Sequence, residues 1–197
     1  MDSALCEQVA FVPATVTRSA KILVTGPFAV GKTTLVASVS EIAPMSTEET
    51  LTQAGAGTDD LTGAPDKTRT TVAFDFGRLT LTDDLVLYLF GTPGQDRFRP
   101  LWQALARGAL GALVLVDTRH LERADDTLTA VERLGLPFAV AVNTFDGAVR
   151  YPPDAVREAL DLPEQVPLTS CDARDRGSAV DALITLVAYL HTLETRS

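Results

Sequence analysis

The sequence is poor in cysteine and has no long apolar run. Its two cysteines, Cys6 and Cys171, can form neither a disulfide framework nor a CxxC pair, which favours a reducing compartment. Apolar stretches such as 109–116 are far shorter than the roughly 20 residues that cross a bilayer. Neither end carries a signal-peptide or lipidation pattern. We therefore expect a cytoplasmic protein that meets a membrane only through partners.

Basic residues are also scarce. Lys and Arg number 17 against 26 Asp and Glu, which gives a formal net charge of −9. Nucleic acids and anionic membranes are both bound through clustered Lys and Arg, so we expect neither nucleic-acid binding nor direct membrane insertion. What the chain does have is 197 residues, 46% of them hydrophobic, which is enough for one globular domain with a full core.

Apolar runs alternate with helical patterns along the chain. The expected strands lie at 20–25, 71–81, 85–90, 109–116, 137–142 and 166–170. The expected helices lie at 31–42, 98–107, 122–134, 153–160 and 176–193. Asp83 and Asp84 separate the second strand from the third and indicate a hairpin. We predict an N-terminal extension at 1–18 and a three-layer α/β domain at 19–195, with a six-stranded, mostly parallel sheet and one antiparallel edge hairpin.

The segment 44–70 has no strong apolar periodicity and is rich in Thr, Gly, Asp and Glu. A stretch of this length without regular structure is uncommon inside a compact domain unless it is functional. We expect a functional loop here, with at most one helical turn at 48–52.

The strongest motif is GPFAVGKT at 26–33, which matches the GxxxxGK[ST] pattern of a phosphate-binding loop, or P-loop. A strand is expected before it and a helix after it, which is the context that this motif needs. Backbone N–H groups of such a loop surround phosphate oxygens, Lys32 would contact the β- and γ-phosphates, and the Thr33 hydroxyl would bind Mg²⁺. The further nucleotide-binding residues expected here are Gly26, Phe28, Ala29, Val30, Gly31 and Thr34.

A second motif, GTPGQ at 91–95, directly follows an expected strand. It resembles the DxxGQ motif of Ras-like GTPases, which implies that the Gly94 N–H contacts the γ-phosphate and that Gln95 orients the attacking water. Gly91 stands where that motif has an Asp that anchors Mg²⁺, so we expect a looser metal site. A plain β-turn at Pro93 and Gly94 is the alternative interpretation.

A third motif, NTFD at 143–146, follows another expected strand and resembles the NKxD motif of the same proteins. A carboxylate accepts from guanine N1–H and the exocyclic amine together, whereas adenine has no such donor pair, so Asp146 would select guanine. Thr144 replaces the Lys that braces the base and the P-loop. An Asx turn that begins at Asn143 is the alternative.

The segment SCDAR at 170–174 stands where Ras-like GTPases have their SAK loop. The resemblance implies that Cys171, Asp172, Ala173 and Arg174 lie at the nucleotide, with the Ala173 N–H on the guanine carbonyl. An ordinary loop explains the segment as well. We interpret Cys171 as a packed thiol rather than a nucleophile.

Together these segments resemble the Cvn-type GTPases, a bacterial branch of the Ras-like family, with the gliding-motility GTPase MglA as a more distant relative. The resemblance covers about 10–193 and is carried by the strings KILV, GPFAVGKTT, TTVAFDFG, LYLFGTPGQDRF and VAVNTFDG. It implies a Ras-like sheet with helices on both faces and two nucleotide-sensitive switch segments, 44–71 and 91–107. It also implies two partners from the same operon, a roadblock-domain homodimer and a sensor-kinase-like protein.

The resemblance assigns further roles. Thr71 would be a second Mg²⁺ ligand, with Thr68 and Thr70 as competitors, and a Thr-rich strand is the plain alternative. Arg69 and Arg97 are candidates for an arginine finger, although a solvated charge is the usual role of such residues. Phe98, Leu101 and Trp102 would form an exposed apolar face for a partner, or else belong to the core.

The sequence thus predicts a slow, Mg²⁺-dependent GTP-hydrolysing molecular switch that binds GTP and GDP, with Gln95 and Lys32 as its catalytic residues. The main alternative is an interaction module that binds nucleotide but hydrolyses it little, which Gly91 and Thr144 favour. A P-loop kinase fits less well, because the expected hairpin order is that of GTPases.

Overall fold

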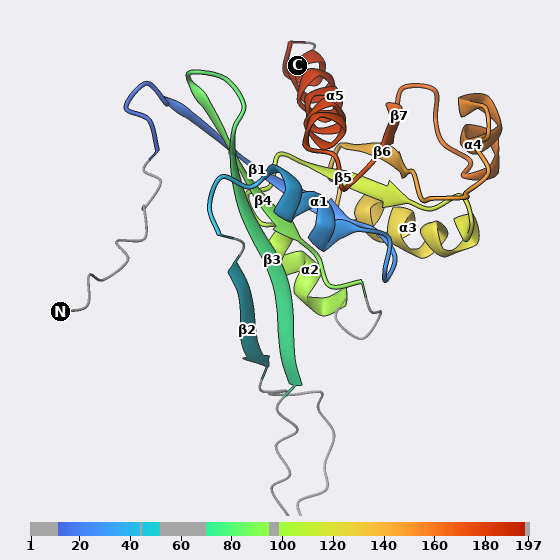
Figure 1. Cartoon of the computed structure of the whole chain (residues 1–197), viewed down its shortest axis with the longest axis horizontal. Coiled ribbons are helices and arrows are strands. Elements are labelled where there is room, and N and C mark those ends of the chain that lie inside the picture. The colour runs from blue at the N-terminus through green and yellow to red at the C-terminus, as the bar shows by residue number, and fades with distance from the viewer. Residues whose placement is uncertain (1–11, 44, 52–69, 95–98, 196–197) are drawn as a thin grey trace, which may run out of the picture.

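The computed structural model describes residues 12–43, 45–51, 70–94 and 99–195, which form a seven-stranded sheet in the order β2-β3-β4-β1-β5-β6-β7 (Figure 1). The five strands from β4 to β7 in this order are parallel, whereas β3 is antiparallel to both β4 and β2. The strands are β1 (Arg18–Thr25), β2 (Met45–Leu51), β3 (Thr70–Thr80), β4 (Leu85–Gly91), β5 (Gly111–Val116), β6 (Phe138–Asn143) and β7 (Leu168–Cys171).

Helices cover both faces of the sheet. They are α1 (Lys32–Val39), α2 (Arg99–Ala106), α3 (Asp125–Arg133), α4 (Pro153–Ala159) and α5 (Arg176–Glu194), with a 3₁₀ turn at Leu121–Ala124. One core cluster packs α1 and α5 against one face, and the other packs α2, α3 and α4 against the opposite face (Figure 1). Successive β1 residues divide between them: Ile22 and Val24 enter the first cluster and Leu23 the second, as strand alternation requires.

The predicted three-layer α/β class is therefore confirmed, and all six predicted strands are present with shifts of one to two residues at most ends. No helix among the described residues is long and apolar enough to cross a membrane. The division at residue 18 between extension and domain stays a prediction.

The seventh strand corrects the prediction for the start of 44–70. Residues 45–51 form β2, paired with β3 from Met45 opposite Phe76 to Leu51 opposite Thr70, so the expected loop with a helical turn is wrong over this range. The sequence MSTEETL carries no apolar alternation from which a strand could be predicted. This edge strand is held instead by main-chain hydrogen bonds to a single neighbour. The expected loop at 52–69 lies outside the described residues.

The parallel strands bring the predicted motifs to one edge of the sheet. The P-loop follows β1, GTPGQ begins at the end of β4, NTFD begins at the end of β6, and the segment 172–174 follows β7. Carboxyl ends of parallel strands meet at the same edge, which is where α/β sheets bind ligands.

Candidate nucleotide site

The P-loop has the backbone shape that its glycines predict. Gly26 and Gly31 both adopt positive φ angles, 146° and 105°. A Cβ atom on Gly26 would lie 2.5 Å from the Leu115 carbonyl oxygen, and one on Gly31 would lie 2.5 Å from Asn143 Nδ2. Larger residues therefore fit at neither position. Gly31 is also the N-cap of α1 and supplies no side-chain cap, so the first N–H groups of α1 face the loop.

Lys32 crosses the mouth of this loop. Its ammonium group donates to the carbonyl oxygens of Gly26 (2.9 Å) and Pro27 (2.7 Å), and the residue is 8% exposed. Burial lowers the pKa of Lys32 to about 8, and the charge of Asp75 opposes this shift. The ammonium group is thus poorly compensated, and an anion that entered the loop would stabilise it.

Gly94 lies directly against the P-loop. A Cβ atom on Gly94 would lie 2.6 Å from Lys32 Nζ and 2.9 Å from the Phe28 backbone. The segment before it is fixed by Thr92, whose hydroxyl donates to that of Thr25 (2.9 Å). The structure thus brings together the two residues that the sequence assigned to the γ-phosphate, Lys32 and Gly94.

Trp102 does not belong to an exposed face. Its side chain is 5% exposed in the core cluster of α2, α3 and α4, and its indole N–H donates to the Pro93 carbonyl oxygen (3.2 Å). A large ring whose N–H has a hydrogen-bond partner is more stable buried than exposed to water. The core alternative is therefore right for Trp102. Leu105 packs against the same cluster.

Asp75 is a site residue that the sequence analysis missed. In the β3–β4 register it stands opposite Gly91, the position where the expected Asp is absent. A Cβ atom on Gly91 would lie 3.0 Å from both the Cβ and Oδ2 atoms of Asp75, and the Thr33 hydroxyl donates to Asp75 Oδ2 (2.6 Å). A carboxylate from the neighbouring strand therefore occupies the space of the missing one. The available signal was a charged residue inside the apolar string AFDFG.

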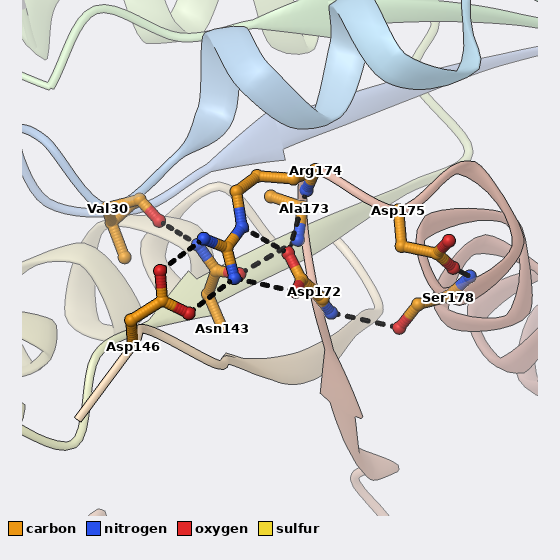
Figure 2. Close-up of polar contacts among 8 residues, drawn as sticks. All are labelled: Val30, Asn143, Asp146, Asp172, Ala173, Arg174, Asp175 and Ser178. Carbon is orange, nitrogen blue, oxygen red and sulfur yellow. Dashed lines mark hydrogen bonds and ion pairs between the residues drawn. The ribbon is translucent and has the colours of Figure 1, made fainter. Parts of the chain in front are cut away.

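Asn143 joins two of the predicted loops. Its side-chain amide donates to the Val30 carbonyl oxygen (2.8 Å), and its Oδ1 accepts from the Ala173 N–H (3.0 Å), as Figure 2 shows. Asn143 is 5% exposed, so both bonds lie in the interior. This bridge replaces the alternative of a local Asx turn. It also uses the Ala173 N–H, which the resemblance assigned to the guanine carbonyl.

Thr144 does not take over the bracing role of the absent Lys through its side chain. Its backbone N–H donates to the Cys171 carbonyl oxygen (2.7 Å), which ties the NTFD loop to β7. Cys171 itself is 1% exposed, and burial raises the pKa of its thiol to about 11. A thiol that resists ionisation fits the predicted packing role.

The far end of the site is a cluster of exposed ions (Figure 2). Arg174 donates from Nη1 to Asp146 Oδ2 (2.8 Å) and from Nη2 to Asp146 Oδ1 (3.0 Å). The same guanidinium donates from Nε and Nη2 to Asp172 (3.0 and 2.9 Å). Hydrogen bonds from Arg174 lower the pKa of Asp146 and hold that of Asp172 at about 2. Both carboxylates are therefore ionised at neutral pH.

Two cavities border the site. A cavity of about 190 Å³ lies between P-loop residues and the side of the site that holds Asp117, Arg119 and Arg123. The Arg119 guanidinium lies 3.8 Å from the Phe145 ring centroid and also donates to the Asp117 carboxylate. A larger cavity of about 560 Å³ lies between α4, β7 and the loop 144–153. It has no P-loop residue in its lining, so it lies beside the phosphate site rather than in it.

Several predicted residues remain untested. Gln95 lies outside the described residues, as do the Mg²⁺-ligand candidate Thr68, the arginine-finger candidates Arg69 and Arg97, and Phe98 of the predicted apolar face. The backbone of Thr71 in β3 pairs with that of Thr50 in β2. The Thr71 side chain is outside the described part, so its role toward Mg²⁺ stays a prediction. The residues that the structure does bring to one edge are Gly26, Phe28, Ala29, Val30, Gly31, Lys32, Thr33, Thr34, Gly94, Asn143, Asp146, Cys171, Asp172, Ala173 and Arg174.

Comparison with known proteins agrees with a P-loop at this edge. A family model described as "Conserved hypothetical ATP binding protein" matches residues 24–192, which is most of the chain. The chain belongs to this family of ATP-binding proteins. The match begins inside β1 and ends in the last turn of α5, so it includes the P-loop and the GTPGQ, NTFD and SCDAR segments.

A curated relative is also similar in sequence. The chain is 28% identical over 128 residues to uncharacterized protein MJ1339 of Methanocaldococcus jannaschii, an alignment that covers 64% of this chain and 70% of the relative. Nucleotide binding thus rests on the motifs, on the geometry and on membership of the ATP-binding family. The base that is bound is a separate question.

Proposed function

We propose that the protein is a GTP-binding and slowly GTP-hydrolysing molecular switch of the Cvn type, which uses Mg²⁺. The observation that carries this proposal is the Asn143 bridge, which ties the P-loop to the segment 172–174. The bridge supports a site in which the loop that would read the base lies beside the P-loop. Asp146 lies three residues beyond it and is held to Arg174 of that same segment.

The choice of guanine over adenine rests on Asp146. Its two carboxylate oxygens accept hydrogen bonds from two neighbouring N–H groups of Arg174, at 2.8 and 3.0 Å. Guanine offers such a pair at N1 and the exocyclic amine, whereas adenine offers an acceptor at N1. An ionised, exposed carboxylate next to a P-loop therefore favours guanine, although the family description names ATP.

The donor set at Thr33 suits Mg²⁺. Hydroxyl and carboxylate oxygens are the ligands that this ion takes in nucleotide sites, together with phosphate oxygens and water. Thr33 and Asp75 already form a hydroxyl–carboxylate pair of 2.6 Å at the start of α1. Bound there, Mg²⁺ would neutralise charge on the transferring phosphoryl group. Thr33 would hold the ion, and Asp75 would orient its shell in place of the absent Asp at 91.

Lys32 and the P-loop backbone would stabilise the phosphoryl group during hydrolysis, and Gln95 would orient the water. The switch would act in the cytoplasm with a roadblock-domain homodimer and a sensor-kinase-like protein, partners that follow from the resemblance alone. The second candidate is an interaction module that binds nucleotide and barely hydrolyses it. The absence of a Lys at 144 and of an Asp at 91 favours this candidate.

Calorimetry with GTP, GDP and ATP in the presence of Mg²⁺ tests the proposal, with Lys32→Ala as the control. We expect micromolar or tighter binding of both guanine nucleotides, much weaker ATP binding, and loss of binding in the control. Equal or tighter ATP binding would refute the role of Asp146 and leave an ATP-binding protein, as the family description has it. Failure to bind any nucleotide would refute the switch for the isolated chain.

Single-turnover hydrolysis separates the two candidates. A switch hydrolyses bound GTP slowly and loses this activity in Gln95→Leu, while its GTP affinity stays the same. An interaction module shows the same negligible rate with and without Gln95.

A further inference from the structure

The guanidinium of Arg174 has the chemical pattern of the base that Asp146 would read. Guanine presents a ring N–H and an amine N–H on adjacent nitrogens attached to one carbon. Arg174 presents Nη1 and Nη2, also attached to one carbon, to the two oxygens of Asp146 at 2.8 and 3.0 Å (Figure 2). This planar fork is the geometry in which a carboxylate accepts two parallel bonds. Arg174 and the guanine edge would therefore compete for the same two acceptor atoms.

Arg174 can release Asp146 at small cost. Arg174 keeps a second partner in Asp172, which accepts from Nε and Nη2 at 3.0 and 2.9 Å, so its charge stays paired when Asp146 is released. The side chains of Arg174 and Asp146 are 54% and 87% exposed, and water can satisfy both during the exchange. The Arg174 backbone is held by a bond that does not involve Asp146, since its N–H donates to Asp172 Oδ1 (3.0 Å), the same oxygen that accepts from Nε. Release of Asp146 thus leaves this backbone bond in place.

We propose that Arg174 is an internal competitor for the guanine base: it occupies Asp146 until a nucleotide displaces it, and so weakens guanine-nucleotide binding and speeds release. This inference rests on the proposed guanine specificity of the site. It makes Arg174 a determinant of affinity whose effect is confined to nucleotides that use Asp146. A purely structural ion pair would have no such selectivity.

The first test is Arg174→Met in the full-length chain, which keeps an unbranched apolar stem and removes every side-chain donor. We expect GDP to bind about three- to tenfold more tightly and to dissociate more slowly, with ATP affinity unchanged. Removal of a positive charge alone would weaken the binding of an anionic nucleotide, so a gain in affinity has the opposite sign to the general charge effect.

The second test is Asp172→Asn, which removes one charge partner of Arg174 while an amide oxygen remains for the Arg174 backbone N–H. Arg174 then has Asp146 as its only anionic partner among those described, and we expect GDP to bind more weakly. The variant makes the protein less acidic, so general electrostatics again predicts the opposite sign. Thermal unfolding of each variant checks that the fold is retained, and the second variant keeps the test open if the first does not fold.

The outcomes separate this inference from the function on which it rests. If the wild type binds GDP selectively and Arg174→Met binds it equally or more weakly, the competitor is refuted and the guanine switch stands. If Arg174→Met raises ATP and GDP affinity alike, Arg174 affects the phosphate site instead, and the competitor is refuted. If the wild type binds no guanine nucleotide, both proposals fall.

Discussion

The two ends of the site are built in different ways. At the phosphate end, Lys32 and Asn143 are 8% and 5% exposed and bond to backbone groups of the P-loop. At the other end, where we propose that the base binds, Asp146 and Arg174 are mostly solvated and bond to each other through side chains. A buried backbone cradle is preorganised and changes little on binding, whereas an exposed ion cluster can be rearranged at small cost. The P-loop end is therefore fixed by the fold, whereas the Asp146–Arg174 end, where we propose that the base binds, can rearrange.

Lys32→Ala should have the largest effect and would sharpen this contrast. We expect GDP affinity to fall by about 100-fold or more, because a charge-assisted contact to phosphate is lost. The free energy of unfolding should change by less than about 1 kcal/mol, since relief of a desolvated charge offsets two lost hydrogen bonds. Calorimetry and denaturant unfolding measure the two quantities. A stability loss as large as the affinity loss would mean that Lys32 is chiefly structural.

Asn143→Ala should damage the fold as well as the site. The Val30 carbonyl and the Ala173 N–H would both lose a buried partner, which costs about 2–3 kcal/mol of unfolding free energy. Thr144→Ala is the matched control, because Thr144 is held to β7 through its backbone N–H, which the substitution keeps. Equal free energies of unfolding for the two variants in urea would mean that the Asn143 side-chain bonds stabilise the fold no more than the Thr144 side chain does.

Asp75→Ala should reduce roughly tenfold the factor by which Mg²⁺ strengthens GDP binding. This is the effect expected when a partner that orients a metal ligand is removed. The double variant with Gly91→Asp moves the carboxylate across the strand pair and should restore most of that dependence. Gly91→Asp alone sets two carboxylates in contact and should destabilise the protein, because like charges repel. Magnesium titrations of GDP binding decide the matter, and an unaltered Asp75→Ala titration would exclude Asp75 from the metal site.

What the sequence could predict follows the same division. The P-loop, β1 and α1 were readable because glycine positions, apolar runs and a fixed spacing all act locally. The strand β2 was not, because its pairing with β3 lies in main-chain bonds that leave no apolar pattern. The helix predicted at 31–42 ends at Val39, where Ser40 turns to extended backbone.

Side-chain partners across strands were the other gap. Nothing local tells that Asp75 stands opposite Gly91, since this depends on the register of the hairpin. The Arg174–Asp146 pair joins residues 28 positions apart on two separate loops. Trp102 was ambiguous because a short amphipathic helix has the same pattern whether its apolar face meets the core or a partner.

The smallest effect we predict is a dependence of GDP affinity on pH that originates at the phosphate end. The Lys32 pKa is lowered to about 8 in the unliganded protein because the ammonium group is buried. A bound phosphate favours the charged form and raises that pKa, so binding takes up a proton above pH 8. Affinity should therefore fall about three- to fourfold between pH 7 and 8.5, with a binding enthalpy that depends on the buffer only at the higher pH. Because Asp146 and Asp172 stay ionised throughout this range, an equal fall in Lys32→Arg would move the origin of the effect away from Lys32.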